Sequence, residues 1–303
     1  MTRRPARAGA PEGGLVVDKA AGLTSHDVVA LARRALGQAR IGHTGTLDPM
    51  ATGVLPLLLG RATRLARFLA ADRKTYEAAV RFGQSTSTYD AEGLPVGPAA
   101  RDLPDRAAVE AVLARFRGRF EQVPPAVSAK RVGGHRAYAL ARAAKPVTLE
   151  PVTVEVTRLE LAGFDGTVAT VVIDCSAGFY VRSLAHDLGI ALGVGGHLVA
   201  LRRTRSGRFA LDDSVSIQRI VDDPHCISAH VIEMAELLSD LPVRPLSPTE
   251  AADVAKGRPV VDADVGASGR LASSFVRLLD ADGALAAVAE PRGGSLHPLV
   301  VLL

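Results

Sequence analysis

The sequence predicts an α+β fold with a mixed, mainly antiparallel sheet, followed by a small β-rich domain at the C-terminus. Segments of strand periodicity and segments of helical periodicity are interspersed without regular βαβ alternation. The 303 residues suffice for about two domains, and a hydrophobic content of 48% supports a full core. Prolines at 242, 245 and 248 predict a linker before the final stretch of about 55 residues.

The first elements are a strand and a capped helix. Leu15–Val17 is typical of a strand. Thr24 or Ser25 then supplies an N-cap for a helix that we expect to continue through about Leu36. Residues 75–82 alternate between apolar and polar side chains, which predicts a second strand.

The middle of the chain continues this mixed pattern. Apolar spacing predicts a helix over 107–117, and residues rich in Val, Thr and Ile predict paired strands over 152–161 and 167–174. The pattern becomes helical after Gly178, with Arg182 and His186 together on one face.

We expect the chain to consist of three segments. We expect a flexible basic tail over 1–13, a domain over 14–240 that carries the sequence motifs, and a C-terminal domain over 241–303. The last domain contains short strand-like runs at Phe275–Leu279 and Leu285–Ala289.

Charge is distributed unevenly between the two domains. Residues 210–303 contain 14 acids and 7 Lys or Arg, a net charge of −7, whereas residues 1–209 contain 18 acids and 29 Lys or Arg, a net charge of +11. Residues 33–67 hold six arginines and one acid, and Arg202, Arg203, Arg205 and Arg208 form a second acid-free cluster. This concentration indicates a phosphate-rich partner, and nucleic acid is the expected one.

Several classes of protein are disfavoured. Cys175 and Cys226 offer neither metal-ligand spacing nor a disulfide framework, and both suit a reducing cytoplasm. The N-terminal residues lack the apolar core of a signal peptide, and no apolar run reaches membrane-spanning length.

The most informative segment is Ile41-Gly42-His43-Thr44-Gly45-Thr46-Leu47-Asp48-Pro49-Met50-Ala51-Thr52-Gly53. Pro49 favours an extended conformation at Asp48, and the glycines permit tight turns or close approach to a ligand. One carboxylate without a neighbouring acid favours covalent or single-base chemistry over a paired-carboxylate hydrolase. An Asp-Pro turn without function is the competing interpretation, and the surrounding motifs decide against it.

Seven motifs in order resemble the bacterial tRNA pseudouridine-55 synthases, the TruB-type family. They cover residues 14 to about 209 and are 14–25, the aspartate segment continued to Arg64, Lys74-Thr75-Tyr76, 82–93, Gln122-Val123-Pro124-Pro125, 176–189 and 197–203. The resemblance implies a pseudouridine synthase catalytic domain and a PUA-like C-terminal domain.

The implied reaction converts uridine-55 in the T-loop of tRNA to pseudouridine. The bond from ribose C1′ to uracil N1 breaks, the base turns, and a C1′–C5 bond forms, without cofactor or metal. The carboxylate can attack the sugar or remove a proton to form a glycal, and the sequence leaves both routes open.

The resemblance assigns roles to individual residues. Asp48 matches the catalytic acid, Arg182 the arginine that pairs with it, and Tyr76 and Tyr180 the residues that line the uracil pocket. Leu201 matches the residue that closes this pocket.

Other residues are expected to bind the rest of the RNA. Lys19 matches a lysine near the opening strand, with a structural role as the alternative to substrate binding, and His43 matches a histidine that occupies the space left by the flipped base. Arg131 stands where the family often has lysine, and Val127 replaces a common tyrosine. The expected phosphate contacts are Arg131, Arg202, Arg203 and Arg205.

The preferred interpretation is a cytoplasmic enzyme that acts on the T-arm of tRNA as a monomer, without an obligate protein partner. One alternative is the guide-RNA-dependent pseudouridine synthase, which shares the aspartate loop. A tRNA-binding folding chaperone is another. A glycosidase is disfavoured because no second acid accompanies Asp48 in a recognisable motif.

Overall fold

The structure, a computed structural model, describes residues 9–70, 73–126, 149–262 and 274–303, together with the backbone of 131–132 and 135–136. The strands of the main sheet are β1 (Gly13–Lys19), β2 (Ile41–His43), β3 (Thr52–Leu59), β4 (Lys74–Phe82), β7 (Gly118–Gln122), β10 (Val152–Phe164), β11 (Val168–Cys175), β12 (Gly196–Ser206), β13 (Phe209–Ala210) and β14 (Val215–Ser216).

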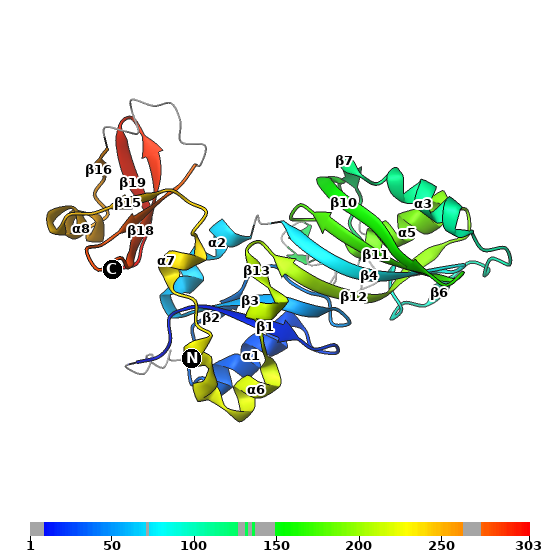
Figure 1. Cartoon of the computed structure of the whole chain (residues 1–303), viewed down its shortest axis with the longest axis horizontal. Helices are drawn as coiled ribbons and strands as arrows, with labels where there is room; N and C mark the ends of the chain where they lie inside the picture. Colours follow the sequence, from blue (N-terminus) through cyan, green and yellow to red (C-terminus); the bar gives the residue numbers. More distant parts are fainter. Residues whose placement is uncertain (1–8, 71–72, 127–130, 133–134, 137–148, 263–273) are drawn as a thin grey trace.

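These strands form one mixed, mainly antiparallel sheet. Its order is β14-β1-β3-β12-β4-β11-β10-β7, with β2 beside β3 and β13 beside β12 (Figure 1). Only the β1–β14 and β3–β12 pairs among its described strands are parallel. Two short hairpins stand apart from it: β5 (Ser85–Thr86) with β6 (Pro95–Val96), and β8 (Arg131–Val132) with β9 (His135–Arg136).

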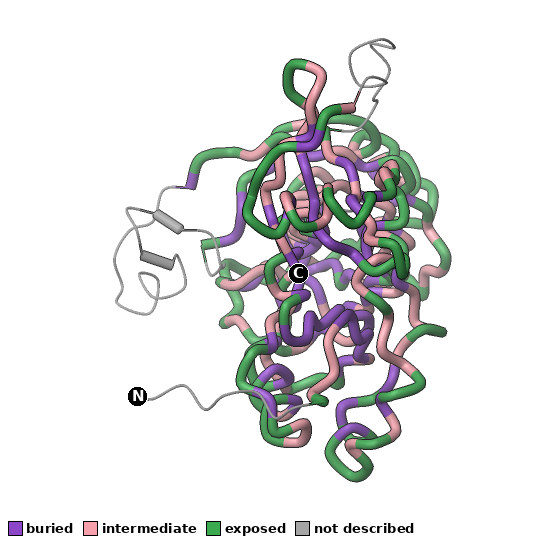
Figure 2. The backbone as a smooth tube through the Cα atoms, turned by 90° about the vertical axis from the view of Figure 1, so that its left-hand side faces the viewer, coloured by how far each residue is buried: buried purple, intermediate pink, exposed green. Residues whose placement is uncertain are grey.

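Helices cover the two halves of this sheet separately. The α-helices before residue 240 are α1 (Ser25–Ala35), α2 (Ala66–Leu69), α3 (Arg106–Ala114), α5 (Val181–Ala191), α6 (Ile217–Asp222) and α7 (Met234–Leu237). The 3₁₀ helices are η1 (Gly60–Leu65), η2 (Leu211–Asp213) and η3 (Pro224–Ala229). Helices α3 and α5 pack on the half that contains β10 and β12, whereas α1 and α6 pack beside β1 (Figure 1). Buried segments run through the centre of the molecule (Figure 2).

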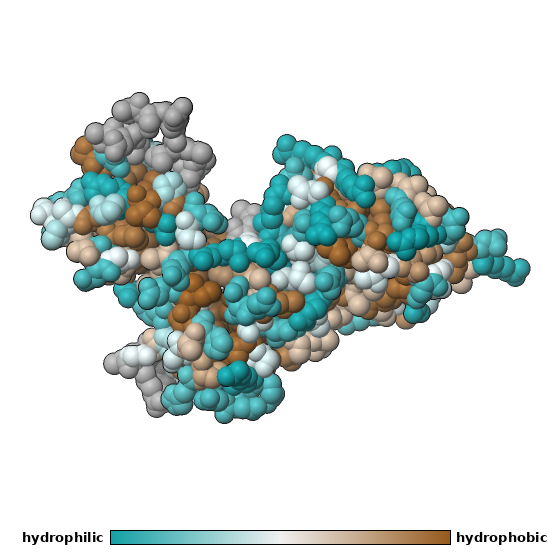
Figure 3. Space-filling view, viewed as in Figure 1, coloured by the Kyte–Doolittle hydropathy of each residue, from teal (hydrophilic) through white to brown (hydrophobic). Residues whose placement is uncertain are grey.

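The C-terminal residues form a second, five-stranded sheet. Its order is β15 (Val243–Pro245), β17 (Val276–Leu279), β18 (Leu285–Arg292), β19 (Ser295–Val301) and β16 (Val260–Val261), and α8 (Pro248–Ala255) packs against it. The surface is hollowed between this sheet and the lobe that carries α3 (Figure 3).

The two domains share an apolar cluster. Val16, Val54 and Leu58 of the first domain are buried together with Val288 and Val300 of the second. The side chains of Arg61 and Arg64 donate to the backbone oxygens of Leu302 and Val301, respectively. These two arginines of the 33–67 group therefore support the domain interface.

Most predicted elements are confirmed, with shifted ends. Helix α1 begins after Thr24, whose hydroxyl accepts from Asp27 N while the Asp27 carboxylate accepts from Thr24 N, a complete capping box. The helix predicted over 107–117 ends at Ala114, because the chain turns into β7.

The linker predicted from the three prolines is wrong. Pro245 ends β15, which pairs with β17, and Pro248 is the first residue of α8. Proline is favoured at the first helical position because the N–H that it lacks would have no partner there.

Three other findings concern the described residues only. Both cysteines are free, and burial raises the pKa of the Cys175 thiol to about 12. None of the helices in the described residues is long and apolar enough to cross a bilayer. Their His, Cys, Asp and Glu side chains form no group of three or more suited to a metal ion.

Candidate active site

A pocket of about 240 Å³ opens beside the aspartate loop. Its walls come from the loop after β2, from β4 and β12, and from the segment that joins β11 to α5. The lining residues are Gly45, Thr46, Leu47, Asp48, Ala70, Lys74, Tyr76, Ser176, Ala177, Gly178, Phe179, Tyr180, Val181, Arg182, Leu201 and Arg203.

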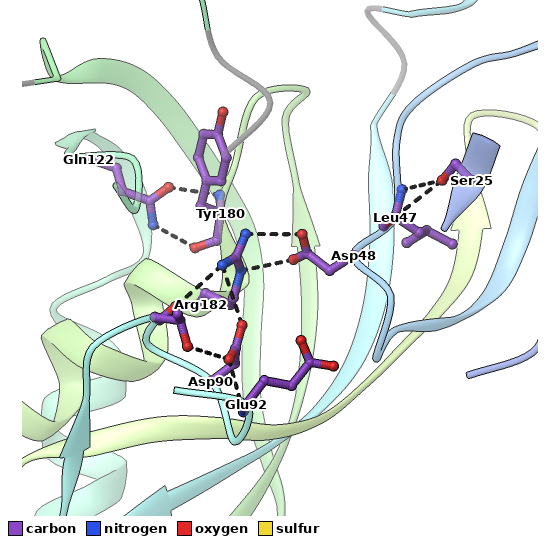
Figure 4. Close-up of polar contacts among 9 residues, drawn as sticks. Ser25, Leu47, Asp48, Asp90, Glu92, Gln122, Tyr180 and Arg182 are labelled. Carbon is purple, nitrogen blue, oxygen red and sulfur yellow. Dashed lines mark hydrogen bonds and ion pairs between the residues drawn. The ribbon is translucent and has the colours of Figure 1, made fainter. Parts of the chain in front are cut away.

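The backbone on both sides of Asp48 is fixed by hydrogen bonds. Leu47 N donates to Ser25 Oγ over 2.9 Å, and Ser25 Oγ donates to Leu47 O over 3.3 Å (Figure 4). On the other side, Pro49 O accepts from Gly22 N at 2.9 Å and from Lys19 Nζ at 3.1 Å. The loop therefore presents its carboxylate from a defined position.

Lys19 is enclosed beneath this loop. It is fully buried and donates also to Leu23 O at 2.7 Å and Ala20 O at 2.9 Å. Burial lowers the pKa of the Lys19 ammonium to about 8, and Asp48 acts in the opposite direction. Lys19 thus supports the loop from below.

Arg182 holds the carboxylate of Asp48 with two nitrogens. Nε lies 2.9 Å from Oδ2, and Nη2 donates to Oδ1 over 3.0 Å (Figure 4). The Arg182 side chain is 6% exposed and the Asp48 side chain 35%, so the carboxylate remains accessible from the pocket. This bidentate arrangement fixes both the position and the plane of the carboxylate.

A second acid binds the far side of the same guanidinium. Arg182 Nη1 donates to Asp90 Oδ2 and to Thr88 O, each at 3.3 Å. The buried Asp90 carboxylate is itself held by Thr88 Oγ1 at 2.5 Å and Glu92 N at 3.1 Å. Asp90 thereby restrains the guanidinium that orients Asp48.

The start of α5 is fastened to the end of β7. Gln122 Nε2 donates to Tyr180 O over 3.0 Å, and Tyr180 N donates to Gln122 Oε1 over 2.8 Å (Figure 4). Ser183 Oγ donates to Val123 O over 2.7 Å. Arg182 is carried between these two anchored residues.

Arg203 forms the inner wall of the pocket. Nε donates to Val54 O over 2.7 Å and Nη2 to Gly45 O over 2.9 Å. Burial raises the pKa of the Tyr76 hydroxyl, which also lines the pocket, and the nearby Arg203 charge acts in the opposite direction. A Cβ at Gly53 would lie 2.1 Å from Arg203 O, so this close approach of β3 to β12 requires glycine.

Comparison with known protein families finds two matches that together cover most of the chain. Residues 33–181 match the N-terminal domain of the TruB family pseudouridylate synthases, and residues 182–251 match the tRNA pseudouridylate synthase B C-terminal domain. The chain belongs to the TruB family.

Similar curated proteins share its length. The tRNA pseudouridine synthase B of Mycobacterium sp. (strain KMS) is 48% identical over 263 residues, which cover 85% of this chain and 87% of that protein. The protein of the same name from Thermobifida fusca (strain YX) is 45% identical over 299 residues, 96% of this chain and 98% of that protein.

Solved structures with a similar fold come from RNA–protein assemblies. An H/ACA RNP bound to a substrate RNA containing 2′-deoxyuridine has a TM-score of 0.71 at 25% identity, covering 96% of this chain and 85% of that chain. An archaeal box H/ACA sRNP Nop10-Cbf5 complex has a TM-score of 0.70 at 25% identity, covering 97% and 87%.

The predicted TruB-type site residues fall into two groups. Asp48, Tyr76, Tyr180, Arg182 and Leu201 lie together around the pocket, although they come from four separate segments of the chain. Lys19, His43, Arg202 and Arg205 are not among the residues that line it.

The residues of the second group lie outside the pocket lining. His43 ends β2 and contacts the ring of His26 edge-on, with centroids 5.5 Å apart. Arg202 is paired with Asp18 through hydrogen bonds of 2.8 and 3.1 Å, and Arg205 is exposed. Arg131 lies in β8, and its side chain lies outside the described residues.

The phosphate contact predicted for Arg203 is contradicted by its burial. Its side chain is 1% exposed, and its guanidinium contacts backbone oxygens inside the protein. Neighbouring residues of a strand face opposite sides, so Arg203 points inward with Leu201 while Arg202 points to Asp18. The apolar Leu201 two residues earlier could have revealed this orientation.

Sequence reasoning gave no role in the site to three residues that position it. Ser25, Asp90 and Gln122 lie within quoted motifs, but their partners are distant in sequence. The available signal was a polar residue beside apolar core positions, since a buried polar side chain needs a partner.

Proposed function

We propose that the chain isomerises uridine-55 in the T-loop of tRNA to pseudouridine, with Asp48 as the catalytic carboxylate. The observation that carries this proposal is the Asp48 carboxylate, held by Arg182 and accessible from a pocket in a TruB-family chain. The C1′–N1 bond breaks and a C1′–C5 bond forms, while C5 loses a proton and N1 gains one, so substrate and product contain the same atoms and no cofactor is consumed.

The pocket offers complementary surfaces to a uracil nucleotide. The ring of Tyr76 can stack on the base, and Leu201 and Tyr180 enclose it. Arg182 keeps the carboxylate directed at the sugar whether Asp48 attacks C1′ or removes a ribose proton. These two routes remain alternatives.

The substrate base must leave its stack to enter this pocket. Proteins that act on a base in folded nucleic acid extrude the nucleotide, and another group can fill the vacated space. His43 is our candidate for that group, with Arg131, Arg202 and Arg205 as candidates for phosphate contacts. The C-terminal sheet is proposed to act as a PUA-like RNA-binding domain.

A stand-alone tRNA enzyme fits better than a guide-dependent one. Curated relatives at 43–48% identity carry the name tRNA pseudouridine synthase B, whereas the two H/ACA assemblies share 25%. We therefore infer a cytoplasmic monomer that needs no protein partner.

The test is purified protein with an unmodified tRNA transcript and position-resolved mapping of pseudouridine. We expect modification at position 55 and none at that position in a transcript that carries cytidine there. Asp48→Asn should abolish turnover while tRNA binding persists, and Asp102→Asn, at an exposed loop position, should match wild type. Binding by the wild type without turnover would contradict the proposal and favour a chaperone.

A further inference from the structure

Tyr89 has a backbone conformation that side chains rarely adopt. Its φ is 65°, and no other non-glycine residue in the described segments has a positive φ. For a bulky residue this conformation is energetically unfavourable and persists only where the surroundings impose it. Glycine would adopt it freely, so the position retains an aromatic ring at an energetic disadvantage.

The ring of Tyr89 is stacked on His186 of α5. The two ring centroids are 3.9 Å apart and the planes are inclined by 10°. Neither residue lines the pocket. His186 lies four residues after Arg182, so both side chains project from the same side of α5.

The turn that contains Tyr89 also holds Arg182. Thr88 O and Asp90 Oδ2, on either side of Tyr89, accept from Arg182 Nη1. Leu198 N donates to Tyr89 O over 2.9 Å, and Ala91 N donates to Leu198 O over 2.9 Å. Rotation about φ of Tyr89 would turn the preceding peptide and carry Thr88 O away from the guanidinium.

We propose that the Tyr89–His186 stack is a positioning device for catalysis. It keeps the 88–90 turn in its left-handed form, so that Thr88 O and Asp90 restrain Arg182 and Arg182 aligns Asp48. Tyr89 and His186 are thus positioning residues that touch no substrate. The inference rests on the proposed pseudouridine synthase reaction.

Four substitutions distinguish the contribution of the stacked rings from that of the backbone conformation at Tyr89. Tyr89→Gly removes the ring and also the backbone strain, and His186→Ala removes the other half of the stack. Both should lower kcat roughly 10- to 100-fold with KM for tRNA unchanged, because misplacement of reacting groups affects the chemical step. Tyr89→Phe and His186→Phe preserve a stacked pair and should stay within about threefold of wild type.

The matched control is Ile190→Ala. This residue lies four positions after His186 on α5, is exposed, and is expected to leave kcat unchanged. The stack acts through Thr88 O and Asp90 in this proposal. In an Asp90→Asn background one of these two contacts is already weakened, so His186→Ala should lower kcat by a smaller factor than it does in the wild type.

Hydrogen exchange gives a readout that does not depend on activity. The amides of Glu92 and Gly93 donate to Asp90, so their exchange should accelerate in His186→Ala and not in Ile190→Ala. Unchanged exchange overturns the inference even if the wild type proves inactive on tRNA, a result that would separately refute the proposed function. A wild-type enzyme that forms pseudouridine, with stack variants equal to it in kcat, overturns the positioning role alone.

Discussion

Gln122 and Tyr180, 58 residues apart in the chain, exchange two hydrogen bonds between the Gln122 carboxamide and the backbone N–H and C=O of Tyr180. Gln122 is 1% exposed, so both of its polar groups depend on this partner. Arg182 follows two residues later and carries the contact to Asp48. The end of β7 therefore helps to determine where the Asp48 carboxylate, our candidate for the catalytic group, lies.

Gln122→Glu should destabilise the fold and slow turnover. A carboxylate cannot donate to Tyr180 O, which leaves a buried acceptor facing a buried charge at a cost of about 1–3 kcal/mol. Urea unfolding and single-turnover pseudouridine formation measure the two effects. Gln218→Glu, at an exposed position of α6, is the matched control, and equal stability of the two variants would contradict this role.

Arg182→Lys should lower kcat about 100-fold or more while the Kd for tRNA changes little. An ammonium cannot make the bidentate contact to Asp48 and simultaneously reach Asp90 and Thr88 O. Filter binding and single-turnover kinetics distinguish the two quantities. A fully active lysine variant would show that the guanidinium geometry is dispensable.

The fold class could be predicted because its signals are local. The alternation in β4 and the capping residue Thr24 each lie within a few residues of the element that they specify. The site residues came from resemblance to a family, since pairs such as Asp48 and Arg182, 134 residues apart, leave no local pattern.

What remained unpredicted depends on tertiary packing. The inward orientation of Arg203 is set by the position of β12 between β3 and β4, in a strand with two register shifts. Pro245 was predicted to lie in a linker. It instead ends strand β15, which pairs with β17, more than 30 residues later in the chain. Such partners are known only once the chain has folded.

Asp187→Asn should stabilise the protein above pH 6. Burial raises the pKa of the Asp187 carboxyl to about 6, so the folded chain holds this proton more tightly than the unfolded chain. Stability therefore falls as pH rises from about 4 to about 6 and stays lower above that range. At pH 7 the asparagine variant should gain roughly 1–3 kcal/mol.

Denaturant titrations of wild type and Asp187→Asn from pH 4 to pH 8 measure this difference. Asp282→Asn, at an exposed turn of the C-terminal domain, should follow the wild-type curve. A constant difference between wild type and Asp187→Asn across the whole range would rule out titration of this carboxyl as the cause.

Val300→Asp should destabilise the whole chain, not only the C-terminal domain. Val300 is buried in the cluster that joins the two domains, where an unpaired carboxylate costs several kcal/mol. For the same reason, truncation near Pro242 should not leave an intact catalytic domain, because Val16, Val54 and Leu58 would lose their cover.

Thermal unfolding followed by near-ultraviolet circular dichroism tests the shared interface. Val261→Asp introduces the same charge at a position that is 77% exposed in the same sheet, and it should unfold at the wild-type temperature. Equal melting temperatures for Val300→Asp and Val261→Asp would indicate domains that are stable independently.

Arg205→Ala and Arg203→Ala should have opposite phenotypes although the residues are two positions apart. Arg205 is exposed, so we expect its loss to remove about one phosphate contact. The slope of log K against log salt should become correspondingly less steep, and kcat at saturating tRNA should stay unchanged. Arg203 is buried against Tyr76, Val54 and Gly45, so its loss should disturb the pocket and the fold, with the salt slope preserved. The measurement is binding of an isolated T-stem-loop between about 50 and 200 mM salt, a range over which a protein with roughly six to ten phosphate contacts loses about 10³- to 10⁵-fold in affinity. The hairpin is expected to serve as a substrate, because unpaired loop bases are available for extrusion while arginines fix the backbone. Modification confined to full-length tRNA, or a salt slope equal to wild type in Arg205→Ala, would place the phosphate contacts elsewhere, with the C-terminal sheet as the next surface to test.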